Sequence, residues 1–461
     1  MNASEPIPSA PGALPVLGHL VPLLRAPLTF LTSLAEQGDL VRIRLGPVGM
    51  LVVCDPELTW QVLHDDRTFD KGGPFTVQAR DVVGNGLATC PHSEHRRQRR
   101  LAQPAFHPRR LPDYAGQMSA CITDVTGSWH EGQIIDVPSE TARIANRVLT
   151  ATLFSEALPE RTRSRLLDDM ATVLSPRWYR RMLTPAPLRR LPTPGNREYQ
   201  RARSRLRRSL DGIVARRRTG GTDHGDLLSA LLAARDPETG GHGLTDTEIT
   251  DEVTSFFLAG TETTSAILAW ALYLLGRHPH IERRLHTEAD TVLSGNPPVH
   301  DHLPRLELTR RIITETLRMY PPIWFLTRTV TADTRLGHHA LPVSTTVLYS
   351  PYLIHHRSDL YDNPSAFDPD RWAPARPQPP RHAFVPFGGG ARKCIGDVFG
   401  MTESVLALAA IAGRWHLHPL SEQDVSPAPG ASLRPPPFTM RVTSRAVSPP
   451  VMAGIPPGNR Q

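Results

Sequence analysis

The sequence predicts a large, mostly helical domain. Two segments carry helical patterns, residues 245–275 and 311–320, and each stops at a glycine or proline break. A length of 461 residues would fit about three domains, yet no long low-complexity linker or internal repeat divides the chain. The glycine pairs at 220–221 and 240–241 are short enough to be loops between helices. We therefore expect one domain over residues 11–445, with flexible proline-containing segments at 1–10 and 446–461.

Composition limits the compartment and the partners. Four scattered cysteines are too few for a secreted disulfide framework, which favours a reducing environment. The N-terminus lacks a basic segment followed by an apolar core, and no run approaches the ~20 apolar residues that span a bilayer. We therefore expect a cytoplasmic protein without a membrane anchor.

The first long helix begins with a capping box. Thr245 is the N-cap and Glu248 follows three residues later, before an apolar run that continues to Leu275. Gly276 and Pro279 close this run. About 30 residues in one helix would extend about 45 Å, enough to cross a whole domain.

The centre of this helix breaks the usual helix preferences. Residues 259–264 contain a glycine and a run of threonines, and glycine in a helix costs about 1 kcal/mol relative to alanine. One interpretation is a functional groove, in which Ala259 and Gly260 leave room for a diatomic ligand, Thr263 donates a hydrogen bond and Glu262 relays protons. The alternative is a kinked core helix whose threonine hydroxyls bond back to the helix.

The second helical segment, residues 311–320, ends at two prolines. Glu315 and Arg318 are spaced i,i+3, so they share one helix face. An exposed pair of this kind is worth only about 0.3–0.5 kcal/mol, so the spacing alone indicates little.

The run from Phe387 to Gly396 is the strongest chemical signal. Three consecutive glycines and Gly396 flank Cys394, and glycine lets the backbone turn its amides toward one sulfur. Phe387 can shield that sulfur, and Arg392 supplies a cation for an acidic group. This arrangement suits a haem held by one axial cysteine. The alternative is a buried structural thiol.

The pattern Phe-x-x-Gly-x-Arg-x-Cys-x-Gly, at Phe387, Gly390, Arg392, Cys394 and Gly396, resembles the haem-ligand signature of the cytochrome P450 family. The resemblance implies a mainly α fold with small β-sheets, in a single large triangular domain. It also implies haem b (iron protoporphyrin IX) as cofactor, with Cys394 as the ligand of the iron.

Two further matches extend the resemblance. Glu262 and Thr263 resemble the acid–alcohol pair of the family, in which aspartate is often the acid. A retained pair favours oxygen activation with external electrons over a peroxide-driven reaction or a haem gas sensor. Glu315, Arg318 and Arg371 match a buried Glu-Arg-Arg cluster, whose role in the family is structural.

Candidate partners of the haem propionates are arginines, because their planar fork suits carboxylates. We expect Arg392, Arg328, and the pair His95 and Arg99 in this role; the pair resembles a Trp-x-x-x-Arg pattern. A histidine at this position would carry a pH-dependent charge. For Arg328 a plain surface ion pair is the alternative.

Apolar residues near these motifs predict a hydrocarbon-like ligand. The alternative, for about half of them, is ordinary core packing. The expected substrate-pocket residues are Phe75, Phe256, Leu258, Ala259, Ile323 and Trp324.

The likeness covers most of the chain and is greatest to actinomycete members that oxidise terpenes. It is carried by Pro11–His19, Gly38–Pro47, His95–Phe106, Leu191–Arg197 and Arg318–Gly396. It implies a monooxygenase that hydroxylates, and oxidises further, an unactivated methyl group of an apolar terpene, in antibiotic or terpenoid biosynthesis. A ferredoxin, reduced by an NAD(P)H-dependent ferredoxin reductase, would supply the electrons. The alternatives are another small hydrophobic substrate (a different sesquiterpene, a fatty acid or a polyketide) and a peroxygenase.

The net charge of +7 comes largely from arginine clusters, the densest at residues 95–100 with Arg109 and Arg110. Three interpretations remain open: a nucleic-acid patch, a solvated helix face, and a basic surface that attracts an acidic electron donor. The last fits best beside the cysteine loop, so we expect no nucleic-acid partner.

Overall fold

The structure is a computed structural model that describes residues 6–155, 158–175, 177–184, 186–421 and 424–445. The predicted flexible tail, 446–461, and residues 1–5 lie outside the described residues. The remainder of the predicted N-terminal segment is attached to the domain. The Ala10 amide donates to the Arg42 carbonyl at 2.9 Å, and the Arg42 amide donates to the Pro8 carbonyl at 2.7 Å. Backbone pairing thus joins Pro8–Ala10 to residue 42, and the flexibility predicted for residues 1–10 stays a prediction.

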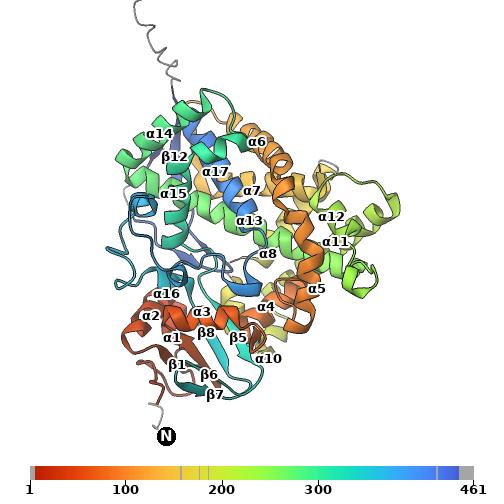
Figure 1. Ribbon diagram of the computed structural model, residues 1–461. Helices are drawn as coiled ribbons and strands as arrows, with labels where there is room; N and C mark the ends of the chain where they lie inside the picture. The colour runs from red at the N-terminus through yellow and green to blue at the C-terminus, as the bar shows by residue number, and fades with distance from the viewer. Residues whose placement is uncertain (1–5, 156–157, 176, 185, 422–423, 446–461) are drawn as a thin grey trace, which may run out of the picture.

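The domain is mainly α-helical, with its largest sheet at the end near the N-terminus and a smaller sheet at the opposite end (Figure 1). The α-helices are α1 (Leu20–Arg25), α2 (Pro27–Ser33), α3 (Pro56–His64), α4 (Gly73–Val83), α5 (His92–Ala102), α6 (Leu111–Gly127), α7 (Val137–Phe154), α8 (Glu160–Val173), α9 (Arg177–Leu183), α10 (Ala186–Arg190), α11 (Pro194–Gly220), α12 (Leu227–Ala233), α13 (Asp246–Arg277), α14 (Pro279–Leu293), α15 (Glu307–Met319), α16 (Pro351–His355) and α17 (Asp397–Arg414). The strands are β1 (Leu40–Leu45), β2 (Val48–Val53), β3 (Phe69–Lys71), β4 (Ile134–Asp136), β5 (Leu326–Val330), β6 (Thr334–Leu336), β7 (His339–Leu341), β8 (Thr346–Tyr349), β9 (Trp415–Pro419), β10 (Ala428–Pro429), β11 (Leu433–Arg434) and β12 (Thr439–Ser444).

The largest sheet has the strand order β1-β2-β8-β5-β3. Only β2 and β8 run parallel; the other neighbours are antiparallel. Its register places Lys71 of β3 directly opposite Arg328 of β5. The smaller sheets are β4-β12-β9 and the hairpins β6-β7 and β10-β11.

Helix α13 runs through the core of the helical part (Figure 1). Its N-terminus has the predicted capping box: the Thr245 hydroxyl accepts from the Glu248 amide at 3.2 Å, and the Glu248 carboxylate accepts from the Thr245 amide at 2.8 Å. Among the described helices, α13 alone has the length and mean hydropathy of a membrane span, but 67% of that apolar window is buried within the protein. We assign its apolar character to the core, because α7, α11, α15 and α17 pack around it.

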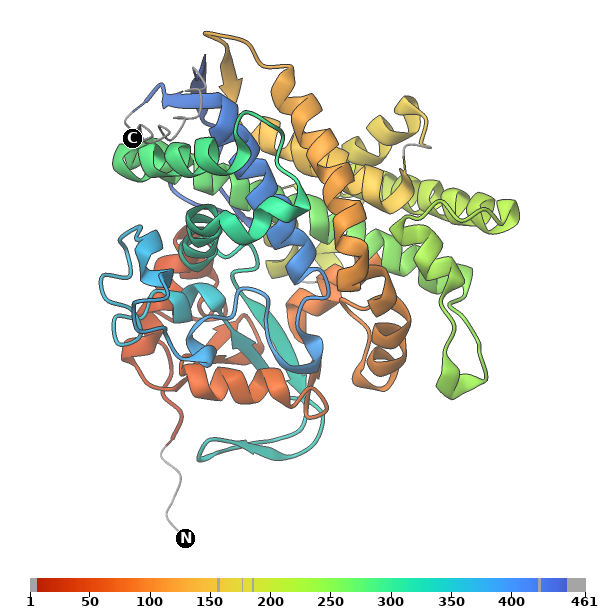
Figure 2. The ribbon, with the colours of Figure 1, turned by 45° about the horizontal axis from the view of Figure 1, so that its top comes forward.

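Helices α6 and α17 pack side by side next to α13, and Figure 2 shows the orange α6 crossing beside the blue α17. Because α17 begins at Asp397, directly after the cysteine loop, this packing fixes the C-terminal end of that loop. Helix α15, predicted over 311–320, begins four residues earlier, at Glu307, and ends at Met319.

Candidate functional site

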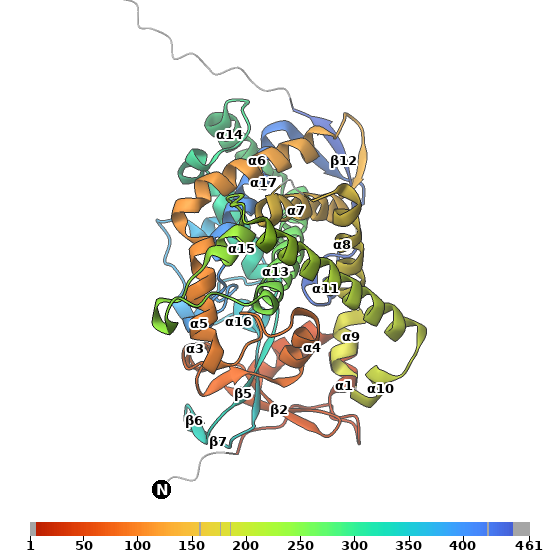
Figure 3. The ribbon, with the colours of Figure 1, turned by 90° about the vertical axis from the view of Figure 1, so that its right-hand side faces the viewer.

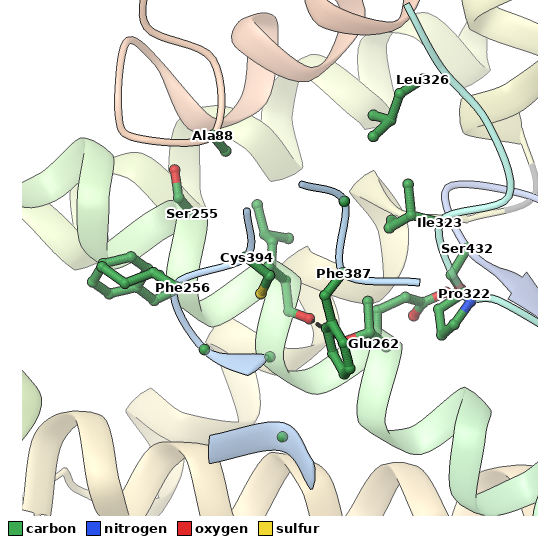
Figure 4. Close-up of a pocket in the computed structure, with 18 of the residues that line it drawn as sticks. Ala88, Ser255, Phe256, Glu262, Pro322, Ile323, Leu326, Phe387, Cys394 and Ser432 are labelled. Carbon is green, nitrogen blue, oxygen red and sulfur yellow. Dashed lines mark hydrogen bonds between the residues drawn. The ribbon is translucent and has the colours of Figure 1, made fainter. Parts of the chain in front are cut away.

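A cavity of about 410 Å³ lies between α13, the cysteine loop and the large sheet, and most of its lining is apolar. Figure 4 shows the Cys394 side chain between Phe256 and Glu262 of α13. Most of the site residues predicted from the sequence meet at this one cavity. They are Phe75, His95, Arg99, Phe256, Leu258, Ala259, Glu262, Thr263, Ile323, Arg328, Phe387, Arg392 and Cys394.

The cysteine loop is held in shape by backbone contacts. The Cys394 amide donates to the Phe387 carbonyl at 2.9 Å, which closes the loop. Gly388 and Gly390 have φ of +70° and +60°, and a Cβ on Gly390 would lie 2.3 Å from the Leu63 carbonyl oxygen. Glycine at 390 is therefore required both by its backbone conformation and by the close approach to α3.

The surroundings of the Cys394 thiol shift its pKa in two opposing ways. Burial raises its pKa, while a hydrogen bond from the Gly396 backbone N–H is the largest effect that lowers it. A metal cation at the sulfur would remove the proton outright. Within the described residues no three metal-binding side chains come together, so a metal at Cys394 would take its other ligands from a cofactor.

On α13, the acid and the alcohol have separate partners. The Glu262 carboxylate accepts a hydrogen bond from the Ser432 hydroxyl at 2.8 Å and lies 3.7 Å from the Arg434 guanidinium. The Thr263 hydroxyl donates to the Ala259 carbonyl at 2.6 Å, which occupies that carbonyl within the helix. Both side chains still line the cavity, so each is placed to act there.

Gly260 lines the cavity, as Ala259 does, and also lies against α7. A Cβ at this position would lie 3.0 Å from the Leu149 side chain of α7. Helix α13 is also continuous through residues 259–264. The glycine therefore lets α7 pack closely against α13, and the prediction that Ala259 and Gly260 leave room for a diatomic ligand stays a prediction.

A pair of cations faces the cavity from the sheet. Lys71 and Arg328 are cross-strand partners, and like charges directly opposite each other destabilise a sheet. The Arg328 guanidinium donates to the Thr327 carbonyl and the Tyr349 hydroxyl. Burial, together with the Arg328 and Arg392 charges, holds the pKa of Lys71 well below its usual range. Such a pair calls for an anionic ligand.

Arg99 adds a third cation; its guanidinium donates to the Lys393 carbonyl beside Cys394. Within the described part of the chain no carboxylate forms an ion pair with Lys71, Arg99 or Arg328. A ligand with two carboxylates, such as the propionates of a haem, would balance these charges. The residues present therefore fit a haem, with Cys394 at its iron.

Two predicted partners of that ligand differ from expectation. The Arg392 guanidinium is bound by the Asp66 and Asp70 carboxylates, each at 2.9 Å, and by the Cys90 carbonyl. Its charge is thus already balanced, and it is the least available of the predicted cations. Burial lowers the pKa of His95 to about 3, so its ring is neutral near pH 7, whereas we expected a pH-dependent charge.

Among the predicted pocket residues, Trp324 lies elsewhere. It is 1% exposed and packs on Tyr179, with ring centroids 5.3 Å apart, in the core beneath the large sheet. Its neighbour Ile323 does line the cavity. Ile323 lies in a bend before β5, after which Trp324 and Phe325 both enter the core, so the prediction is wrong for Trp324.

The structure also adds lining residues that the sequence analysis missed. Lys71, Leu87, Trp178 and Ser432 line the cavity. Lys71 had one signal in the sequence: the chain has only two lysines, 71 and 393, and both border this cavity. Ser432 had none, because its position depends on a hairpin far along the chain.

Glu315 and Arg318 form a fully buried ion pair at 2.8 Å. The Arg371 guanidinium lies 3.5 Å from the same carboxylate, which also accepts from the Trp372 ring N–H at 2.8 Å. The Arg318 guanidinium further donates to the carbonyls of His355 and Pro364. These bonds join α15, α16 and the segment before the cysteine loop into one rigid support.

A single cysteine facing an apolar cavity, a long helix across it and unpaired cations at its edge define a haem-thiolate protein, and the chain belongs to the cytochrome P450 family. The sequence profile of that family, described as Cytochrome P450, matches residues 8–442.

Known relatives agree with this assignment. The chain is 47% identical to pentalenene oxygenase of Streptomyces avermitilis over 95% of this chain and 97% of that protein. It is 44% identical to cyclooctatin synthase of Streptomyces melanosporofaciens, over 94% of both chains. Among solved structures, the haem domain of cytochrome P450DA superposes with a TM-score of 0.86 at 30% identity, over 96% of this chain and 98% of that one.

Proposed function

We propose that this cytochrome P450 is a terpene monooxygenase that oxidises an unactivated methyl group of a small polycyclic hydrocarbon. Pentalenene, converted to an alcohol and then an aldehyde, is our leading candidate. The observation that carries the proposal is the apolar cavity between the Cys394 sulfur and the Glu262–Thr263 pair. The names of the relatives, pentalenene oxygenase and cyclooctatin synthase, support a terpene as substrate.

Haem b would be held by Cys394, with Lys71, Arg99 and Arg328 at its propionates. When bound, the haem supplies the chemistry of oxygen activation, which the thiolate favours by donating electron density. Phe387 lines the cavity near Cys394 (Figure 4), so it would limit access of water to the thiolate.

The proton supply is assigned to Glu262 and Thr263. Glu262 is 18% exposed at its side chain and contacts Arg434, which is 37% exposed, so the carboxylate links the solvent side to the cavity. The Thr263 hydroxyl has one hydrogen, now donated to Ala259, and two lone pairs that can accept. It can therefore pass a proton only if it releases the Ala259 carbonyl.

The cavity selects its substrate by shape more than by hydrogen bonds. Phe256 packs edge-to-face on Phe106 at 5.0 Å, and Phe75 packs on Trp178 at 5.3 Å. Aromatic pairs of this kind form stiff walls. Stiff apolar walls suit a rigid polycyclic molecule that lacks polar handles.

The electron donor is proposed to be a ferredoxin served by an NAD(P)H-dependent reductase, in a cytoplasmic setting. Arg96 at the surface of α5 pairs with Glu238 and is 83% exposed at its side chain, and Lys393 beside Cys394 pairs with Asp397 and is 51% exposed. These cations lie near the predicted thiolate side and fit an acidic partner. Arg97 and Arg100 of the same run are more buried and are bound to Glu248 and Asp236, so they are less accessible to a partner than Arg96.

Two measurements test the proposal. The carbon monoxide complex of the reduced protein is expected to show the absorption of a thiolate-ligated haem, and Cys394→His to lose it while still binding haem. A panel of cyclic sesquiterpenes and cyclic diterpene alcohols is then titrated, and pentalenene is expected to give the largest optical shift. A protein that binds no terpene but shifts with fatty acids would overturn the substrate assignment.

The peroxide-driven alternative is tested separately. Turnover with ferredoxin, reductase and NADPH is compared with turnover in hydrogen peroxide alone. The Glu262–Thr263 pair predicts that the ferredoxin system gives far more product per haem. Equal yields with peroxide would assign the protein to the peroxygenases.

A further inference from the structure

The 84–90 loop, between α4 and α5, forms one wall of the cavity. Leu87 and Ala88 at its centre line the cavity, as do Val82 and Val83 at the end of α4. Figure 4 shows Ala88 next to Ser255 of α13. The wall has no regular secondary structure to fix it, so its position depends on where its backbone amides are bound.

Two neighbouring acids on α13 bind this loop. The Asn85 amide donates to the Asp251 carboxylate at 2.8 Å, and the Leu87 amide donates to the Glu252 carboxylate at 2.9 Å. Glu252 is fully buried, and its second carboxylate oxygen has no hydrogen-bond partner among the described residues. Burying a carboxyl group that lacks hydrogen bonds costs free energy, so the hydrogen bond from the Leu87 amide is needed to hold Glu252 at this position.

The loop has glycines where the acids approach it. A Cβ on Gly84 would lie 2.2 Å from the Asp251 carboxylate oxygen, and Gly84 has a φ of +70°. A Cβ on Gly86 would lie 2.9 Å from both the Asp251 carbonyl oxygen and the Ser255 hydroxyl oxygen. Only glycine fits the loop this closely against α13, and this approach brings the two amides within reach of the acids.

Asp251 also connects the wall to α11. The Arg207 guanidinium of α11 forms an ion pair with the Asp251 carboxylate, and a second one with Asp211 at 3.2 Å. Figure 3 shows α4, α11 and α13 close together on this side of the molecule. One buried carboxylate therefore joins a cavity-lining loop to a helix that itself lies outside the cavity.

We propose that Asp251 and Glu252 are positioning residues for substrate selectivity: by binding the amides of the 84–90 loop they fix the Leu87–Ala88 wall against which the substrate is oriented. The part of this proposal that concerns selectivity rests on the proposed function. The anchoring itself does not, because it concerns only residues of this chain.

The test uses the haem-loaded enzyme and two variants of Glu252. Glu252→Leu removes the acceptor and keeps an apolar side chain of similar reach, while Glu252→Gln keeps an amide oxygen that can accept from Leu87. Hydrogen exchange of residues 84–90 is measured by mass spectrometry. Exchange is expected to be about tenfold faster in Glu252→Leu and close to wild type in Glu252→Gln.

The second readout is the distribution of terpene products. In Glu252→Leu the main product is expected to lose share to other regioisomers, and KM is expected to rise more than kcat falls. A purely structural role would lower thermal stability and leave the product ratio unchanged. Unchanged exchange in Glu252→Leu, or faster exchange with an unchanged product ratio, would overturn the proposal.

Asp251 provides a second variant and Asp211 a matched control. Asp251→Ala, nearer the surface, is expected to free the Asn85 amide and so tests the anchoring if Glu252→Leu fails to fold. Asp211→Asn removes the other partner of Arg207 without touching the loop and is expected to keep wild-type exchange and products. If the wild type oxidises no terpene, the proposed function fails. The exchange rates of residues 84–90 then show whether Glu252 anchors the loop. The optical shift that a bound ligand causes, compared between wild type and Glu252→Leu, shows whether the loop affects ligand selectivity.

Discussion

Replacing Glu315 by glutamine is expected to destabilise the protein strongly without changing its shape. The carboxylate is fully buried and accepts from the Arg318 Nε at 2.9 Å, the Arg318 Nη2 at 2.8 Å and the Trp372 ring at 2.8 Å. Glutamine keeps one acceptor and presents an N–H₂ to a guanidinium, which leaves the buried cation of Arg318 uncompensated. Breaking a buried pair in this way costs about 3–5 kcal/mol.

A loss of 3 kcal/mol corresponds to more than a hundredfold change in the unfolding equilibrium. The assay is urea unfolding of the haem-loaded protein, followed by the haem absorption and by far-ultraviolet circular dichroism. Glu307→Gln, at the exposed first turn of the same helix, is the matched control and is expected to change the midpoint little. A Glu315→Gln midpoint equal to that of the control would refute the reasoning that the cluster is a buried, mutually dependent unit.

Three further outcomes are expected. Thr263→Ala should retain haem but divert reducing equivalents to peroxide. The Thr261 hydroxyl bonds to the Phe257 carbonyl away from the cavity, so the control Thr261→Val should keep the wild-type yield of product per NADPH. Equal yields in the two variants would contradict a role for Thr263 in proton supply. Lys71→Met should speed haem loss to a scavenger about tenfold and stabilise the haem-free protein, because the like-charged neighbour is gone. Lys393→Met should do neither, since Lys393 pairs with Asp397. Burial raises the pKa of Glu252 from 4.5 to about 8, so the stability it contributes is complete below pH 4.5 and is lost as pH rises through about 8. Between pH 6 and 8 this group is expected to lower the free energy of unfolding by up to about 1.4 kcal/mol per pH unit, and Glu252→Gln should remove that contribution. Urea unfolding at several pH values measures it. Parallel pH curves for the two proteins would show that Glu252 ionises normally.

Features encoded by neighbouring residues could be predicted from the sequence. The capping box at Thr245 and Glu248 depends on residues three apart, and the loop around Cys394 is set by its own glycines. The family resemblance then placed Arg371 near Glu315, which spacing alone could not do. The cytochrome P450 fold itself was predicted correctly on the same basis.

Features that depend on distant pairing were beyond the sequence. The opposition of Lys71 and Arg328 exists only through the register of β3 and β5, which are far apart in the chain. Arg392 lies close to Cys394 in sequence, but its acidic partners come from residues 66 and 70. From the local sequence we expected an unpaired Arg392 guanidinium, but Asp66 and Asp70 balance its charge in the folded protein.

The hairpin of β10 and β11 has a consequence for engineering. Its turn presents Ser432 both to the cavity and to the Glu262 carboxylate, and Arg434 follows two residues later. A chimera that takes this hairpin from a relative would replace part of the cavity wall and, at the same time, the two residues that contact the Glu262 carboxylate. If Glu262 supplies protons as proposed, grafts that keep residues 432 and 434 unchanged are expected to retain coupled turnover, and grafts that change them are expected to lose it.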